Sequence, residues 1–208
     1  MLTAAACILA AYLCGSIATA VWVGRVVRGI DIREHGSGNA GATNVARVVG
    51  VPWGLLVGLI DILKGLVPVA LLSSVVARGF GIGTAEAGLI LGVAAIVGHL
   101  YPAFAGFKGG KGVLTALGVS LALLPIEAGI AALVWLGVFA IWRTVSLGSI
   151  VATIMFVAAT LVHRLISGSN PPTSLVVMAF VIGVLVFVTH RSNIRRLMAG
   201  TESRFKRS

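Results

Sequence analysis

The chain has 208 residues, of which 58% are hydrophobic and only 11% are charged, and its mean hydropathy is +1.07. This composition excludes an ordinary soluble domain and indicates an integral membrane protein. Sixteen Lys and Arg stand against six Asp and Glu, which gives a formal net charge of +10. The two cysteines, Cys7 and Cys14, lie in one apolar segment, so neither a disulfide framework nor a thiolate metal site is expected.

Apolar segments long enough to cross a bilayer recur along the whole chain. No basic residue precedes the first of them, so we expect it to remain as a span and not to be a cleaved signal peptide. The fourth segment is short and ends at Pro125, which leaves six spans as the alternative to seven. We predict an all-α, polytopic membrane helix bundle with seven transmembrane helices, near residues 2–24, 54–77, 86–104, 113–124, 126–142, 146–163 and 173–190.

The positions of the basic residues predict the orientation of this bundle, because Lys and Arg gather in cytoplasmic loops. With seven spans and the N-terminus outside, thirteen basic residues fall on the inside, two fall on the outside, and Lys64 lies within a span. The C-terminus and every polar, glycine-rich segment are then cytoplasmic. No polar stretch is long enough to bury a core of its own, so we expect a single domain over residues 1–208 with one cytoplasmic site.

The first polar segment, residues 35–47, reads HGSGNAGATNVAR. Its glycines let the backbone approach a ligand closely, and Arg47 adds a guanidinium suited to bidentate phosphate contact. A solvated loop that caps a short helix is the alternative interpretation. The residues expected to bind a phosphorylated substrate here are Ser37, Gly38, Asn39, Thr43 and Asn44.

A second segment, residues 98–112, reads GHLYPAFAGFKGGKG, and we name its last part, residues 105–112, the lysine turn. It lacks the Ser or Thr that follows the lysine of a Walker motif, so neither a nucleotide nor magnesium is expected. Two ammonium groups and backbone N–H donors ahead of a helix near Val113 are suited to holding phosphate, although such a turn also serves topology alone. The residues expected to contribute are Lys108, Gly109, Gly110, Lys111 and Gly112.

Asp61 and Lys64 stand three residues apart inside the second span. A lone charge at mid-membrane costs about 2.5–3.5 kcal/mol on insertion scales, and this spacing lets the two charges neutralise each other. We favour an internal ion pair that sets packing, with a role in orienting the cationic site as the alternative. His99 and His163 are expected to be structural.

His190 and Asn193 lie on one helix face where the last span ends, within the sequence HRSNIRRLMAGTE. A His and Asn pair at the interface can donate to an oxyanion or relay a proton. Ser146 either caps the sixth span or belongs to the site. The sequence holds no Gly-x-Ser-x-Gly elbow and no metal-ligand cluster, so covalent and metal catalysis have no candidate residues.

These segments together resemble the bacterial acyl-phosphate:glycerol-3-phosphate acyltransferase family, PlsY. The similarity covers nearly the whole chain. It runs in order from YLCGSI at 12–17 through residues 37–47, DILKG at 61–65, the lysine turn and SLG at 146–148 to HRSNIRRLMAGTE at 190–202. Ala18 and Leu114 depart from the family pattern and fall on none of the expected ligands.

The resemblance implies an enzyme with seven helices in the inner membrane of a bacterium, with its active site on the cytoplasmic side. It would transfer a fatty acyl group from acyl phosphate to the sn-1 hydroxyl of glycerol 3-phosphate. The products would be lysophosphatidic acid and phosphate, in the first acylation step of phospholipid synthesis. We expect Arg47, Lys111, His190 and Asn193 to be catalytic, with the substrate's own phosphate as the base and His190 orienting groups or relaying a proton.

The expected partners are acyl phosphate, glycerol 3-phosphate, membrane lipid and the soluble enzyme that supplies acyl phosphate. Neither a nucleic acid nor a cofactor nor a metal is expected. A phosphate or organic-anion transporter is the alternative, but it should open polar groups to both faces, whereas this sequence concentrates them on one. A third possibility is a membrane adaptor that recruits soluble enzymes through its basic face.

Overall fold

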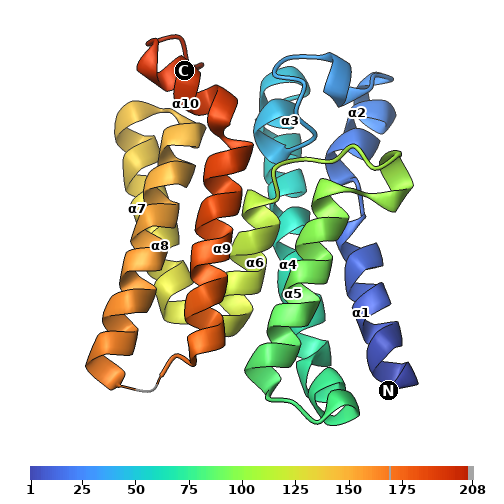
Figure 1. Ribbon diagram of the computed structural model, residues 1–208. Helices are drawn as coiled ribbons and strands as arrows, with labels where there is room; N and C mark the ends of the chain where they lie inside the picture. The colour runs from blue at the N-terminus through green and yellow to red at the C-terminus, as the bar shows by residue number, and fades with distance from the viewer. Residues whose placement is uncertain (169, 206–208) are drawn as a thin grey trace. The chain divides into compact units, whose positions relative to one another are not determined.

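The structure, a computed structural model, describes residues 1–168 and 170–205. All regular elements among these residues are helices (Figure 1). The chain divides into two compact units, residues 1–123 and 124–208, and each is described by itself. The predicted class, an all-α polytopic membrane bundle, is confirmed. The expectation of one domain over residues 1–208 stays a prediction.

The first unit begins with a helix that is broken after about four turns. The side-chain hydroxyl of Ser16 donates to the carbonyl of Tyr12 (2.9 Å), and the chain resumes as a second helix at Thr19. That helix ends at Gly29, whose φ of +66° suits glycine at a helix C-terminus. The elements of this unit are α1 (Leu2–Gly15), α2 (Thr19–Arg28), η1 (Ile32–Glu34), α3 (Ala42–Val48), α4 (Val51–Phe80), α5 (Thr84–Leu100), η2 (Ala103–Ala105) and α6 (Val113–Leu123).

Glycines let the long helices of this unit approach one another backbone to backbone. A Cβ added at Gly15 of α1 would lie 2.1 Å from the carbonyl oxygen of Ala95 in α5, and one at Gly98 of α5 would lie 2.2 Å from that of Tyr12. Gly65 and Gly118 play the same part between α4 and α6. Small residues at such crossings are typical of helix packing in membranes, where close contact replaces the hydrophobic effect.

A small hydrophobic core holds the loop regions at one end of the first unit. Val21 of α2, Ile32 of η1, Val45 of α3 and Val57 of α4 are all fully or almost fully buried in it. Apolar burial contributes roughly 1.5–3 kcal/mol for each such side chain. The segment from residue 29 to residue 50 is therefore anchored on α4 by its buried side chains, while its residues 34–38 are exposed.

The described residues of the second unit form four helices. Near the start of its first helix, the buried Glu127 carboxylate pairs with the Nδ1 atom of His163 on the next helix. His163 is thus structural, as predicted, because it satisfies a carboxylate that would otherwise be buried without a partner. The helices are α7 (Pro125–Trp142), α8 (Val145–Ser167), α9 (Thr173–Thr189) and α10 (Arg191–Met198).

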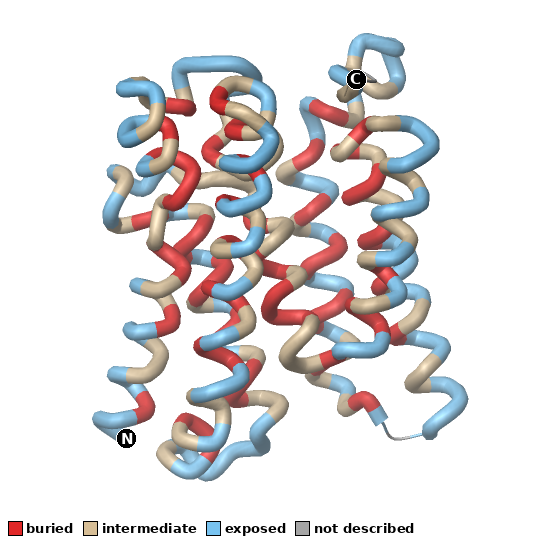
Figure 2. Tube along the Cα trace, turned by 180° about the vertical axis from the view of Figure 1, so that it is seen from behind, coloured by how far each residue is buried: buried red, intermediate tan, exposed pale blue. Residues whose placement is uncertain are grey.

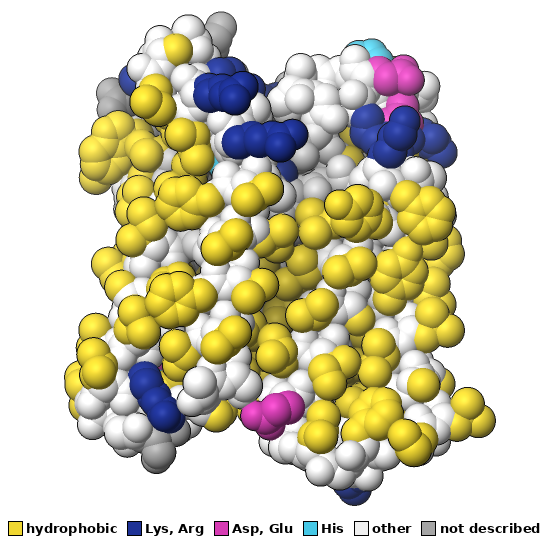
Figure 3. All heavy atoms as spheres, in the orientation of Figure 1, with side chains coloured by type: hydrophobic (Ala, Val, Ile, Leu, Met, Phe, Trp, Pro, Cys, Tyr) yellow, Lys and Arg dark blue, Asp and Glu magenta, His cyan; other side chains and the backbone are white. Residues whose placement is uncertain are grey.

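In both units buried and exposed residues alternate along the helices (Figure 2), and many of the exposed residues are large and apolar. Apolar side chains cover the middle of the drawn face of each unit, and Lys and Arg lie toward the helix ends (Figure 3). This pattern suits helices surrounded by lipid.

Five helical segments among the described residues are long and apolar enough to cross a membrane, and α9 with α10, bent by 61°, would make a sixth. The short fourth apolar segment forms the 11-residue helix α6. A helix is present at each of the seven expected positions, while the exact number of spans and the orientation stay predictions.

Candidate functional site

The first polar loop is shaped by Asn44, which is almost fully buried in α3. Its side-chain amide donates to the carbonyls of Ile32 and His35 (2.9 Å each), and its oxygen accepts from the backbone N–H of Ser37 (2.9 Å). Asn44 thus holds the loop in place, while Ser37 and Gly38 are exposed on its surface. Gly38 has a φ of +72°, which glycine adopts without strain.

Arg33 joins this loop to the lysine turn. Its Nη1 atom donates to the backbone carbonyls of Ala105 (2.7 Å) and Lys108 (3.2 Å). Its Nε and Nη2 atoms donate to the carboxylate of Asp31 at 2.9 and 2.6 Å. The hydrogen bonds and charge of Arg33 hold the pKa of Asp31 well below its usual range, so the carboxylate is ionised and fixes the guanidinium.

The lysine turn folds back onto the end of α5. It passes through two residues with positive φ, Gly106 (+63°) and Phe107 (+57°), before the N–H of Gly109 donates to the carbonyl of Leu100 (3.1 Å). The N–H of Gly110 donates to the carbonyl of His99 (3.3 Å). These two N–H groups are engaged within the protein, so the expectation that they donate to a phosphate is not supported. Their donors close the turn instead.

Glycine is required in the turn for a different reason, which is space. A Cβ at Gly109 would lie 1.9 Å from the carbonyl oxygen of His99, and one at Gly110 would lie 2.5 Å from that of Ala40. The lysine turn and the first polar loop are therefore in direct backbone contact at Gly110. The structure thus brings two of the predicted binding segments together within the first unit.

The cationic side chains flank this contact. Lys108 is exposed and borders a narrow pocket, and Lys111 is half-buried just before α6. Arg47 is exposed in the last turn of α3, whereas Gly112 is buried with a φ of +76°. Two segments that contact each other thus carry three basic groups, a composition suited to a ligand with more than one negative charge.

The other predicted segments lie in the second unit and meet at Glu202. One oxygen of its carboxylate accepts from the hydroxyl of Ser146 (2.7 Å) and from the amide of Asn193 (2.6 Å), while the other accepts from Nε of Arg196 (2.6 Å). Burial raises the pKa of Glu202, but these hydrogen bonds outweigh it and leave the pKa below its ordinary value. Ser146 and Asn193, both buried, are thus brought together by a carboxylate.

His190 is buried at the junction of α9 and α10. Its Nδ1 atom lies 2.8 Å from the carbonyl oxygen of Val186, and a carbonyl can only accept. Nδ1 therefore carries the hydrogen, and in the neutral ring Nε2 is the nitrogen with the lone pair. This tautomer is the one that a proton-relaying or orienting histidine at this position would use.

The chain is similar to known proteins over nearly its whole length. A sequence profile described as glycerol-3-phosphate acyltransferase matches residues 5–200. The chain belongs to this family. Relatives of that name from Geobacter sulfurreducens and Aquifex aeolicus are 47% and 44% identical to it, over 94% and 95% of this chain and 94% and 97% of theirs.

Solved structures of the family share the fold. The crystal structure of PlsY (YgiH), an integral membrane glycerol 3-phosphate acyltransferase, in its glycerol 3-phosphate form has a TM-score of 0.85 at 43% identity, covering 98% of this chain and 96% of that one. Its lysophosphatidic acid form has a TM-score of 0.82 at the same identity and coverage. The resemblance inferred from the sequence is therefore confirmed at the level of family and fold.

Three residues that organise the candidate site were not singled out from the sequence: Arg33, Asp31 and Glu202. Each belongs to an ion pair, and the chain has only six acidic residues. Because carboxylates are few in this strongly basic membrane protein, each is a candidate for a specific contact, and a buried carboxylate needs a partner. That scarcity was the available signal for both Asp31 and Glu202.

Proposed function

We propose that the protein transfers a fatty acyl group from acyl phosphate to the sn-1 hydroxyl of glycerol 3-phosphate, at a cytoplasmic membrane face. The main support is the contact between the first polar loop, which leads to Arg47, and the lysine turn, which carries Lys108 and Lys111. Both substrates carry a phosphate group, and the fatty chain of the acyl phosphate remains in the bilayer. Family membership favours acyl transfer over the transporter and adaptor alternatives.

In this proposal the three basic side chains hold the two phosphates, so that the hydroxyl of glycerol 3-phosphate lies near the carbonyl of the acyl phosphate. Orientation of this kind can supply about 7–11 kcal/mol of the barrier. The hydroxyl oxygen attacks the acyl carbon, the bond from that carbon to the phosphate oxygen breaks, and phosphate leaves with the bonding electrons. Lys108, Lys111 and Arg47 stabilise the charge that develops on the departing phosphate.

The hydroxyl proton passes to a phosphate oxygen of the substrate in this scheme, because an acyl phosphate is already activated and a strong protein base is less necessary. Asn193 and Ser146 would bind a substrate oxygen from the second unit, and His190 would orient that group or relay the proton. The carboxylate of Glu202 fixes the side chains of Ser146 and Asn193 beside each other.

The test is to purify the protein in lipid vesicles and to supply acyl phosphate with radiolabelled glycerol 3-phosphate. Formation of lysophosphatidic acid with release of one phosphate per acyl group supports the proposal. No product, or product formed equally well from acyl-CoA, means that the donor is assigned wrongly. Product acylated at the other free hydroxyl would refute the sn-1 assignment.

A further inference from the structure

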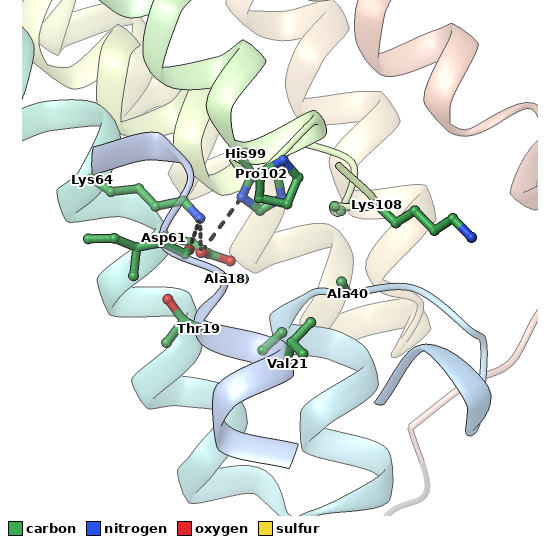
Figure 4. Close-up of a pocket in the computed structure, with 13 residues that line it drawn as sticks. Ala18, Thr19, Val21, Ala40, Asp61, Lys64, His99, Pro102 and Lys108 are labelled. Atoms are coloured by element: carbon green, nitrogen blue, oxygen red, sulfur yellow. Dashed lines mark hydrogen bonds and ion pairs between the residues drawn. The ribbon is translucent and has the colours of Figure 1, made fainter. Parts of the chain in front are cut away.

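A buried ion pair lies next to the lysine turn in the first unit (Figure 4). The carboxylate of Asp61 and the ammonium of Lys64 are 2.8 Å apart on consecutive turns of α4, and their side chains are 4% and 3% exposed. A buried pair of charges gains little or nothing over apolar side chains of the same size. We therefore infer the role of this ion pair from its contacts with other elements.

Both partners reach beyond α4. The ammonium of Lys64 donates to the backbone carbonyl of Ile17 (2.9 Å), at the break between α1 and α2. The carboxylate of Asp61 lies 3.7 Å from Nδ1 of His99, in the last turn of α5. The pair thus links the broken first span, α4 and the end of α5, and each of these elements leads into the cytoplasmic loops of the first unit as we orient it.

His99 also contacts the lysine turn, on the side of its ring away from Asp61. Its backbone carbonyl accepts the N–H of Gly110 (3.3 Å), and a Cβ at Gly110 would lie 2.5 Å from Nε2 of the same residue. The ring therefore stands between Asp61 and Gly110. Nδ1 has no hydrogen-bond partner among residues 1–168 and 170–205, and the Asp61 carboxylate is the charge it faces.

A narrow pocket lies between these groups, and their burial around it shows whether they contact a substrate or hold the lysine turn. The pocket is lined by Asp61, Lys64, His99, Lys108 and Gly110 among others. The side chains of Asp61, Lys64 and His99 are at most 7% exposed, so they lie behind the turn and not on its surface.

We propose that Asp61, Lys64 and His99 are positioning residues that set the location of Gly109 and Gly110. They thereby set the direction of Lys108 and Lys111, which flank these glycines. This inference rests on the proposed function in that it assigns phosphate binding to the two lysines. The inference goes beyond a packing role for the ion pair, because packing alone requires no contact between Asp61 and His99, the histidine that contacts Gly110.

The test compares single variants with a double variant in which both charges are removed at similar volume. Asp61→Asn and Lys64→Met each leave one buried charge without its partner, so both are expected to lower thermal stability. The double variant Asp61→Asn/Lys64→Met contains no buried charge and is expected to recover that stability. It still lacks the carboxylate that faces His99 and the donor to the carbonyl of Ile17.

The positioning role predicts that the stable double variant has a KM for glycerol 3-phosphate raised roughly 10- to 100-fold, the range that a displacement of about 1 Å produces. His99→Asn, whose amide can take the place of Nδ1, should keep more affinity than His99→Leu. A double variant with recovered stability and native KM would overturn the inference and leave only a packing role. Equal losses in His99→Asn and His99→Leu would overturn the part assigned to the ring.

The matched control is the other buried carboxylate and histidine pair, Glu127 and His163 of the second unit. Glu127→Gln/His163→Gln should change thermal stability and leave the KM for glycerol 3-phosphate unchanged. Binding of inorganic phosphate, measured directly by calorimetry, separates the two proposals. If the wild-type protein makes no lysophosphatidic acid, the proposed function fails, whereas weaker phosphate binding by the double variant would still support positioning.

Discussion

Replacement of Arg33 by lysine tests whether the joint between the first polar loop and the lysine turn matters for catalysis. Lysine keeps the positive charge but cannot bond the carbonyls of Ala105 and Lys108 and the carboxylate of Asp31 with a single planar group. Hydrogen bonds from a charged donor are worth about 1.5–3 kcal/mol. The Arg33 side chain is 23% exposed, so we use the lower part of that range.

A loss of about 1.5–2 kcal/mol corresponds to a roughly 10- to 30-fold change in an equilibrium or rate. We expect Arg33→Lys to raise the KM for glycerol 3-phosphate by that factor in vesicles supplied with acyl phosphate, with kcat changed less, because the contacts of Arg33 hold the turn alike in the ground and transition states. Arg28→Lys, at an exposed arginine of α2, is the control and should be neutral. The argument is refuted if Arg33→Lys and Arg33→Ala both keep the native KM.

Three further predictions concern single side chains. Lys111→Ala or Arg47→Ala should lower the acyl-transfer rate at least about 100-fold, as expected for loss of a well-placed charged donor, and near-native rates in both would refute the proposed phosphate clamp. Gly110→Ala should weaken glycerol 3-phosphate binding, because its Cβ would meet the carbonyl oxygen of Ala40, whereas Gly137→Ala, with open space around it, should bind normally. The depressed pKa of Glu202 predicts stability that is complete above its ordinary pKa of 4.5 and is lost as pH falls through the lower folded value. Melting temperatures of the wild type and Glu202→Gln should therefore converge with falling pH, and a constant difference across that window would contradict the assignment.

The glycine pattern shows how far local sequence predicts a binding segment. The sequence alone indicated that residues 105–112 form a turn with two ammonium groups, because glycines and lysines between apolar runs have few other uses at a membrane boundary. It also suggested that the backbone N–H groups of Gly109 and Gly110 were available to a ligand. The structure shows that they close the turn onto α5, a pairing that depends on where the preceding helix ends.

Roles of single polar residues were harder to predict from the sequence. The sequence predicts Asn44 as a ligand because it stands among other polar residues, and the structure adds three hydrogen bonds by which it holds its own loop. Arg33 looked like one more basic residue of a cytoplasmic segment, and its contacts with Ala105 and Lys108 span more than 70 positions of the chain. No local pattern encodes a partner at that separation, because the contact exists only when both loops are packed.

Composition and the spacing of apolar runs by themselves determined that this is a polytopic helical membrane protein. That class follows from what a bilayer demands of every spanning segment, so each segment reports it locally. The ordered motifs carried the resemblance to the glycerol-3-phosphate acyltransferase family. Only the tertiary structure decided that Arg33 joins two loops, that His99 stands between Asp61 and the lysine turn, and that Glu202 gathers Ser146 and Asn193. Those pairings depend on backbone contacts between elements distant in sequence, which packing creates and local sequence does not specify.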